Sequence, residues 1–208
     1  MKRLYLLRHG QTEFNVKKLV QGRCDSPLTN LGRQQAQTAA AWLKAHRVVP
    51  DKVVSSPLGR AMDTASLVAA ELLGPDAAVE PCKGIIERCY GTFEEGPHDA
   101  LPTDVWDPGE DLVPFGGEGS HALQERMVGT LTNLMGAEGI ETLLAVSHGS
   151  ASRQFIKAAA PEGFELPTKL HNCAIMIFDF DEEKSGEEGA VPQSKFILQQ
   201  IIDPQQSN

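Results

Sequence analysis

Short apolar runs alternate with segments of helical spacing along most of this chain. Residues 3–7, 51–55 and 141–147 are apolar runs bounded by polar or turn residues, which predicts three short buried strands. Between the first two, and again after the second, alanines, leucines and valines recur at intervals of three and four, which predicts two amphipathic helices. Strands that alternate with helices pair in parallel. The sequence therefore predicts an α/β fold: a three-layer α/β/α sandwich around a mostly parallel sheet.

The second half of the chain is expected to add two helices and two strands. Residues 120–135 begin with a serine, a good N-cap, and have helical spacing, and another helix is expected after Gly149. Residues 172–179 and 195–202 predict two closing strands. The acidic residues 181–189 between these strands indicate a solvated hairpin loop.

The segment between residues 92 and 125 does not follow this pattern. It contains four prolines and several glycines, it is rich in acidic residues, and it has no Lys or Arg. Segments of this length and composition form irregular loops that are usually functional or mobile. We therefore expect one domain over residues 1–208, with a lid-like excursion at about residues 92–119.

Charge and cysteine content narrow the class of protein. The net charge of −9 disfavours binding to nucleic acid or to an acidic membrane surface, although a local cationic pocket is compatible with it. The four cysteines form no C-x-x-C pair, and the opening apolar stretch is interrupted at Arg8, too early for an export signal or a membrane span. These features predict a cytoplasmic protein with a small-molecule partner. The sequence leaves the oligomeric state open, and a homodimer is compatible with it.

A histidine follows the end of two predicted strands. His9 ends the first strand, and His148 ends the strand at residues 141–147. Ligands of open α/β sheets bind beyond the carboxyl ends of the strands, so the two histidines predict one shared site. The guanidinium of Arg8 offers paired donors for a phosphate or carboxylate there. Arg60 follows the second strand closely and is expected at the same edge.

These residues belong to five short motifs that follow one another in a fixed order. The motifs are Arg8-His9-Gly10 with Thr12 and Asn15; Gln21-Gly22 with Asp25-x-Pro27-Leu28-Thr29; Ser55-Ser56-Pro57 with Arg60-Ala61; Glu87-Arg88-x-Tyr90-Gly91; and Ser147-His148-Gly149. Together they resemble the histidine phosphatase superfamily, which includes the cofactor-dependent phosphoglycerate mutases. The resemblance covers about the first three quarters of the chain and implies a phosphoglycerate mutase-like fold.

Phosphoryl transfer needs a nucleophile, donors for the phosphoryl oxygens and a proton for the leaving oxygen. A neutral ring nitrogen of His9 is suited to attack phosphorus and to form a phosphohistidine that water then hydrolyses. The phosphoryl oxygens are expected to meet a set of donors at the strand ends: Arg8, Arg60, His148, Asn15 and the backbone N–H groups near Gly149. With these cations, neither a metal ion nor a cofactor is required.

The general acid is assigned by the resemblance. Glu87 occupies the place where the family carries the carboxyl group that protonates the leaving alcohol and later activates water. Residue chemistry alone does not distinguish Glu87 from the other acids. The resemblance also implies substrate contacts by Arg88 and Tyr90. For Asn15, Gln21 and Gly22, ligand contact and loop architecture both remain open.

A phosphatase is favoured over a mutase. A mutase must hold a second anionic group, and the family's mutases place paired basic residues after the acid, whereas this chain has no Lys or Arg between Arg88 and Arg126. We therefore predict a metal-independent phosphomonoester hydrolase that acts through a phosphohistidine on a small phosphorylated metabolite. The alternatives are a cofactor-dependent phosphoglycerate mutase, which the block at residues 87–91 resembles, and an inactive protein that binds a phosphorylated ligand.

Overall fold

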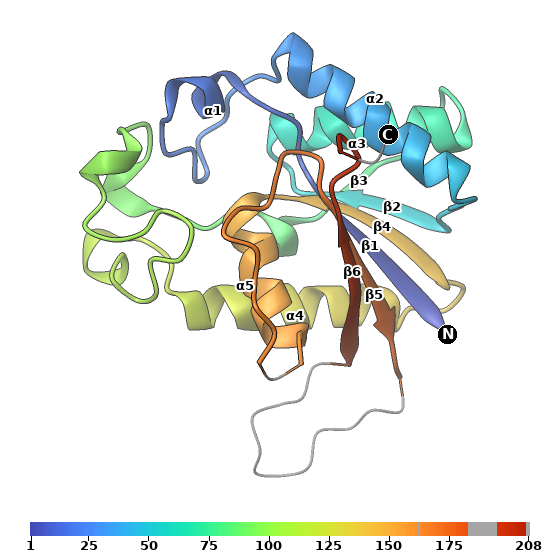
Figure 1. Cartoon of the computed structure of the whole chain (residues 1–208). Helices are drawn as coiled ribbons and strands as arrows, with labels where there is room; N and C mark the ends of the chain where they lie inside the picture. The colour runs from blue at the N-terminus through green and yellow to red at the C-terminus, as the bar shows by residue number, and fades with distance from the viewer. Residues whose placement is uncertain (162, 183–194, 207–208) are drawn as a thin grey trace.

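The computed structural model describes residues 1–161, 163–182 and 195–206, and its centre is a six-stranded sheet within that part of the chain (Figure 1). The strand order is β3-β2-β4-β1-β5-β6. Four strands run parallel to one another: β1 (Lys2–Arg8), β2 (Lys52–Ser55), β3 (Glu80–Pro81) and β4 (Thr142–Ser147). The fifth strand, β5 (Ile175–Phe180), pairs antiparallel with β1. The sixth, β6 (Phe196–Ile202), pairs antiparallel with β5 and forms one edge of the sheet.

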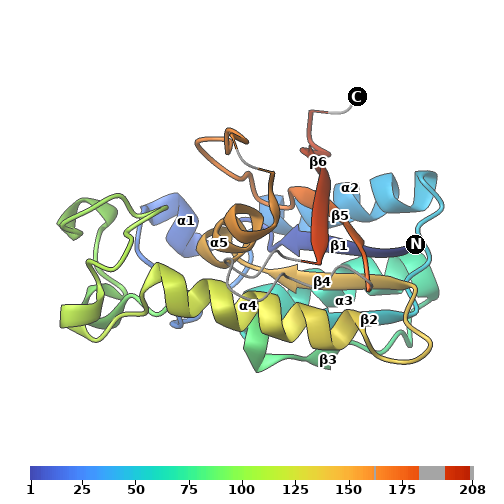
Figure 2. The same ribbon diagram turned by 90° about the horizontal axis from the view of Figure 1, so that it is seen from below.

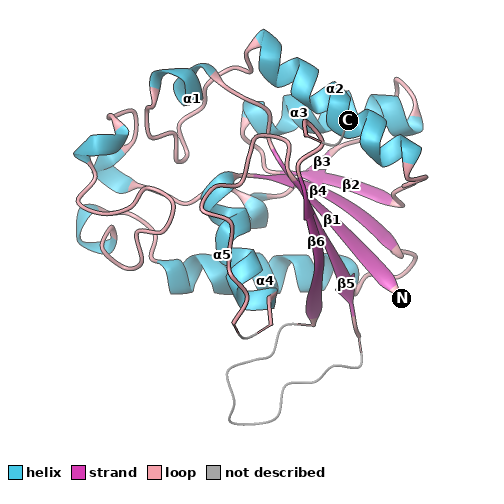
Figure 3. Ribbon diagram, in the orientation of Figure 1, coloured by secondary structure: helices cyan, strands magenta, loops and turns pink. Residues whose placement is uncertain are grey.

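Helices cover both faces of this sheet (Figure 3). Helices α2 (Asn30–Ala45) and α3 (Gly59–Leu73) pack on one face, and α4 (Ser120–Met135) and α5 (Gly149–Ala159) pack on the other. The predicted three-layer α/β/α sandwich with a mostly parallel sheet is therefore confirmed.

Strand β1 shows how the sequence produces these layers. Leu4 and Leu6 pack into the core beneath α4 and α5, while Tyr5 and Leu7 pack into the core beneath α2 and α3. Side chains alternate between the two faces of a strand, and both faces of this sheet are covered. Successive residues in the middle of this strand must therefore all be apolar, because each faces one of the two cores. The last residue of the strand, Arg8, lies at the end of the sheet where the parallel strands terminate.

Some elements differ from the expectation. The short helix α1 (Glu13–Lys17) is new, and Thr12 and Asn15 cap it reciprocally through their side chains and backbone N–H groups. Helix α4 begins at Ser120 as expected, but its N-cap is Gly119, and the Ser120 hydroxyl accepts a hydrogen bond from Arg88 instead. Most of the predicted acidic hairpin loop at residues 181–189 lies outside the described residues.

The excursion contains turns of 3-10 helix and has a small core of its own. These turns are Gly91–Phe93, His98–Ala100 and Val113–Phe115, and a further one at Lys83–Ile85 precedes the excursion. Tyr90, Leu101 and Leu112 are buried against Val20, which lies in the loop between α1 and α2 (residues 18–29, called the α1 loop below). Figures 1 and 2 both show α1 and the excursion beyond the same end of the sheet, where β1 and β4 end.

Among the residues that the structure describes, no helix has the length and apolarity that crossing a lipid bilayer requires.

Candidate active site

Two histidines meet at the carboxyl ends of adjacent strands. Strands β1 and β4 pair in parallel with Arg8 opposite Ser147, so His9 and His148 leave the sheet side by side. Both rings are buried, and their centroids are 5.1 Å apart. The structure thus brings the two histidines together, as the two strand ends predict.

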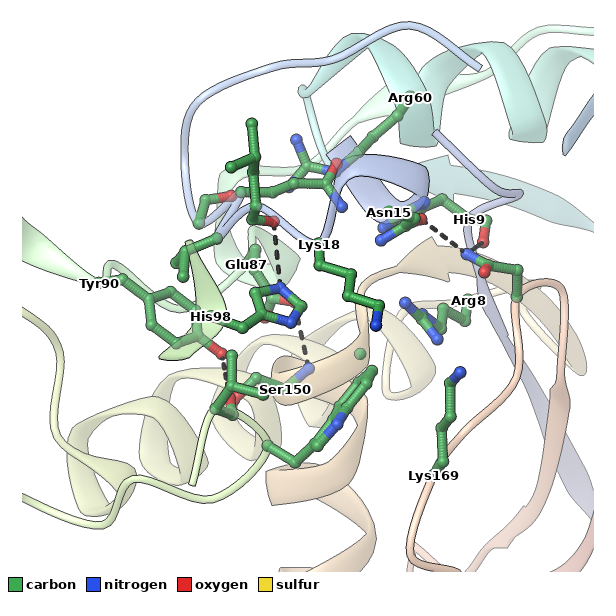
Figure 4. A pocket seen from close by; sticks show the side chains of 18 residues that line it. Arg8, His9, Asn15, Lys18, Arg60, Glu87, Tyr90, His98, Ser150 and Lys169 are labelled. Atoms are coloured by element: carbon green, nitrogen blue, oxygen red, sulfur yellow. Dashed lines mark hydrogen bonds between the residues drawn. The ribbon is translucent and has the colours of Figure 1, made fainter. Parts of the chain in front are cut away.

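A cavity of about 290 Å³ opens beside these rings (Figure 4). The sheet edge, the α1 loop, α3, the excursion and the segment after α5 all contribute to its wall. The cavity brings together most of the predicted site residues: Arg8, His9, Asn15, Gln21, Gly22, Arg60, Glu87, Tyr90 and Gly149. His148 lies behind the wall, against His9, and Arg88 does not border the cavity.

The His9 ring is held in a defined tautomer. Its Nδ1 lies 2.7 Å from the carbonyl oxygen of Gly10, which only accepts, so Nδ1 carries the proton and Nε2 keeps its lone pair. Burial lowers the pKa of His9 well below its ordinary value, and the charges of Arg60 and Arg8 lower it further. At neutral pH the ring is therefore uncharged, with a lone pair on Nε2.

His148 is oriented by the loop after β2. The Ser56 hydroxyl accepts from the Leu58 N–H and lies 2.6 Å from Nε2 of His148, so it is placed to donate to that nitrogen. This arrangement leaves the proton of a neutral ring on Nδ1. Burial, together with the charges of Arg60 and Arg8, lowers the pKa of His148 well below its ordinary value.

Arg8 and Arg60 are both buried cations. Arg8 donates to the carbonyl oxygen of Leu170, and burial lowers its pKa to about 10, so it stays charged at neutral pH. Arg60, at the start of α3, donates to the carbonyl oxygens of Gly22 and Cys24, each at 2.7 Å. These bonds to the α1 loop fix the direction of its guanidinium.

Three buried nitrogen atoms at this site have no hydrogen-bond partner within the described part of the chain. They are Nε of Arg8, Nε of Arg60 and Nδ1 of His148. Buried polar groups are nearly always paired, because an unpaired one costs about 1–3 kcal/mol. Two of these atoms, on Arg8 and Arg60, belong to residues that border the cavity, and they are suited to a ligand with several acceptor oxygens, such as a phosphoryl group.

Glu87 occupies the N-terminus of helix α5. Its Oε1 accepts from the backbone N–H groups of Arg88 and Ala151, each at 2.8 Å, and its Oε2 accepts from Ser150 at 3.1 Å. The predicted phosphate contact by the N–H groups near Gly149 is therefore corrected for Ser150 and Ala151, whose N–H groups donate to the Glu87 carboxyl group. The dipole of α5 instead holds the carboxyl group at the cavity wall.

Arg88 binds other parts of the chain and does not make the predicted substrate contact. It is fully buried and donates to the hydroxyls of Ser150 and Ser120 and to the carbonyl oxygens of Glu118 and Gly109. These acceptors belong to α5, α4 and the excursion, so Arg88 ties the excursion to the helix that holds Glu87. With its donors used in this way, the guanidinium is not available to a ligand in the cavity.

The remaining predicted contact residues border the cavity and also stabilise the loops around it. Asn15 accepts with Oδ1 from Asn172, which leaves its amide N–H groups for a ligand, and Gln21 accepts from the Thr12 hydroxyl. Gly22 has φ +51°, a conformation that favours glycine. The Tyr90 hydroxyl donates to the carbonyl oxygen of Val105, and burial raises the pKa of Tyr90.

Trp106 is a site residue that sequence reasoning missed. It comes from the excursion, borders the cavity, and stacks over the Arg8 guanidinium at 5.2 Å from the ring centroid. A Cβ atom added to Gly149 would lie 2.8 Å from Trp106 and 3.3 Å from Arg8. Glycine at position 149 therefore allows the excursion to close directly on the helix N-terminus.

We expect Gly149→Ala to lower kcat/KM for a phosphomonoester by about 10²-fold, because the methyl group displaces Trp106 and the Arg8 guanidinium from their working positions. Gly129→Ala is the matched control, since an added Cβ there meets nothing within 4 Å and the residue lies in helix α4. That control is expected to keep full activity and to gain up to about 1 kcal/mol of stability. Steady-state kinetics and thermal unfolding of both variants test this, and equal activities would contradict it.

The lowered pKa of His9 predicts how its ring titrates. A lowered pKa means that the ring binds its proton only at lower pH, so His9 is expected to stay neutral at about pH 5.5, where an ordinary imidazole is mostly charged. The ¹⁵N shifts of the ring in the free protein, assigned with His9→Ala, report this directly. A protonation midpoint at or above the ordinary value of about 6.5 would contradict the burial argument.

Two lysines and two further side chains of the cavity also escaped sequence reasoning. Lys18, His98, Lys169 and Asn172 border the cavity from three separate segments. None follows the carboxyl end of a predicted strand, although Asn172 begins one. The side chain of Asn172 donates to the carbonyl oxygen of His9 and so supports the loop that follows β1.

Comparisons with known proteins agree with this geometry. Residues 4–188 match the model of the histidine phosphatase superfamily (branch 1). A broad-specificity phosphatase of Saccharomyces cerevisiae is 32% identical over 182 residues, which are 86% of this chain and 79% of that protein. A protein of Cronobacter sakazakii named "Probable phosphoglycerate mutase GpmB" is 32% identical over 193 residues, 88% of this chain and 86% of that one.

A solved structure extends the likeness over the whole fold. A mutant phosphoserine phosphatase from Entamoeba histolytica, in complex with phosphoserine, has a TM-score of 0.73 at 27% identity, over 99% of this chain and 98% of that one. The chain belongs to the histidine phosphatase superfamily, which confirms the resemblance of its five motifs.

Proposed function

We propose that this protein hydrolyses phosphomonoesters in two steps, through a phosphohistidine at His9 and without a metal ion. The observation that carries the proposal is the neutral His9 ring, whose Nε2 keeps its lone pair while buried arginines surround it. The phosphatases among its relatives support it.

In the first step, Nε2 of His9 attacks phosphorus, the bond from phosphorus to the ester oxygen breaks, and Glu87 gives its proton to the leaving oxygen. Arg8 and Arg60 offset the charge on the phosphoryl oxygens. In the second step, Glu87 takes a proton from water, the water oxygen attacks phosphorus, and the phosphorus–nitrogen bond breaks. Inorganic phosphate leaves, and both groups return to their starting states.

Hydrolysis of p-nitrophenyl phosphate in the presence of EDTA tests this proposal. We expect turnover, together with an acid-labile, base-stable phosphoprotein after a rapid quench. No turnover at any pH between acidic and neutral would favour the alternative of an inactive binding protein. Interconversion of 2- and 3-phosphoglycerate far faster than release of inorganic phosphate would favour the mutase that some relatives are named for.

We also propose that the enzyme works in the cytoplasm on a small-molecule substrate. All four cysteines are free thiols in the structure, as suits a reducing compartment. A fractionation experiment with the tagged full chain tests the location.

A further inference from the structure

The cavity wall carries more positive charge than a phosphoryl group needs. Among the described residues that border it, Arg8, Arg60, Lys18 and Lys169 are cations, and Glu87 is the one acidic side chain, which carries a proton when the proposed reaction starts. Asp25 pairs with Arg60 at 3.4 Å, so the wall with this carboxylate has a formal charge of +3 in a chain whose net charge is −9. A phosphomonoester brings a charge of about −2 at neutral pH. A bound phosphoryl group therefore leaves a surplus of about one positive charge.

The four cations occupy two levels of the cavity. Arg8 and Arg60 are buried beside His9, where the phosphoryl group binds. Lys18 and Lys169 are exposed and border the same cavity, so they lie at its mouth, where it opens to solvent. Figure 4 shows both amino groups reaching into the opening near Arg8.

These two lysines differ from most others in the structure. Lys2, Lys44, Lys52 and Lys157 each form an ion pair with a carboxylate. Within the described residues, neither Lys18 nor Lys169 has an acidic partner within ion-pair distance. Lys18 also has φ 55°, in the left-handed region, where it ends α1 at the rim of the cavity.

We propose that Lys18 and Lys169 form a subsite for a second anionic group on the leaving alcohol. Charge balance favours a single negative charge, as in a carboxylate, over a second phosphate. The inference rests on the proposed function, since it places the reacting phosphate at His9. It also revises the sequence argument, which looked for basic residues only between Arg88 and Arg126, whereas the structure brings two lysines from elsewhere.

A matched set of substrates tests the subsite. 3-Phosphoglycerate carries a carboxylate where glycerol 3-phosphate has a neutral hydroxymethyl group, and glycerol 1,3-bisphosphate carries a second phosphate at that end. We expect kcat/KM to be about tenfold higher for the carboxylate than for the neutral ester, with the bisphosphate between them. This preference is expected to shrink as salt is raised from about 20 mM to about 500 mM, because both lysines are exposed.

The variants Lys18→Gln and Lys169→Gln are each expected to lower kcat/KM for 3-phosphoglycerate by roughly two- to fivefold. Both are expected to leave glycerol 3-phosphate within about twofold of the wild type. Lys17→Gln is the control, because it removes the same charge from the neighbouring residue, which does not border the cavity. A loss as large in Lys17→Gln, equal losses with both substrates, or a greater preference for the bisphosphate would overturn the proposal.

Binding to His9→Ala separates this inference from the proposed function. That variant cannot turn over substrate, so calorimetry with 3-phosphoglycerate and glycerol 3-phosphate measures the subsite without catalysis. Tighter binding of the carboxylate that disappears in His9→Ala/Lys18→Gln/Lys169→Gln supports the subsite even if no ester is hydrolysed. Equal affinities would reject it even if p-nitrophenyl phosphate is a good substrate.

Discussion

Replacing His9 by alanine is expected to abolish turnover of p-nitrophenyl phosphate and to remove the trapped phosphoprotein at the same time. The expected loss in kcat is on the order of 10⁴-fold or more, because the variant has no nucleophile to split the reaction into two steps. Stopped assays and alkali-quenched samples with ³²P-labelled substrate measure both effects in one preparation.

His121→Ala is the control for this experiment, since His121 is exposed on α4 and lies outside the cavity. It is expected to keep the activity and the phosphoprotein of the wild type. If His9→Ala kept the labelled phosphoprotein, another residue would be the nucleophile, and the assignment of His9 would be wrong.

Replacing Glu87 by glutamine is expected to have the second largest effect, and its size depends on the leaving group. With an alkyl phosphate, kcat is expected to fall by about 10²–10⁴-fold, because the alkoxide leaves poorly without a proton. With p-nitrophenyl phosphate, the loss is expected to stay below about tenfold, because the phenolate leaves without help. Steady-state rates over a series of leaving groups measure the difference as a steeper dependence on leaving-group pKa.

The structure requires a stability control for Glu87→Gln. The amide that this substitution introduces would present N–H groups where the Glu87 carboxylate accepts from the backbone of Ser150 or Ala151, so we expect a stability loss of about 1–3 kcal/mol. The comparison between leaving groups is made within one variant, so a partly unfolded fraction cancels. Equal losses for good and poor leaving groups would count against Glu87 as the acid.

The fold could be predicted from local patterns because each pattern has one physical cause. A strand buried on both faces must be apolar along its buried length, and residues 4–7 of β1 and 143–146 of β4 have that composition. A helix on a sheet needs one apolar stripe, which the small residues of α2 and α3 provide. Helix α1 could not be predicted this way. It has five residues, none of them buried, and depends on the Thr12 capping box.

The site was predictable where a residue stands at the end of an element. Arg8 ends β1, and His9 and His148 directly follow β1 and β4. Because these two strands are parallel neighbours, their carboxyl ends lie together at one end of the sheet. Arg88 shows where this reasoning fails. Its motif indicated a substrate contact, but its direction is set by four acceptors on α4, α5 and the excursion, which are distant in sequence.

The sequence by itself determined five of the six strands, the layered α/β class and the two strand ends that carry the histidines, because these follow from hydrophobic periodicity within short segments. Strand β3 has two exposed residues and gives no such pattern. Only the tertiary structure decided what surrounds the two strand ends. Trp106 on Arg8, Glu87 on the start of α5, and Lys18 with Lys169 at the mouth are contacts between segments far apart in the chain. Such contacts depend on how irregular loops pack against the sheet, and no local sequence pattern specifies that packing.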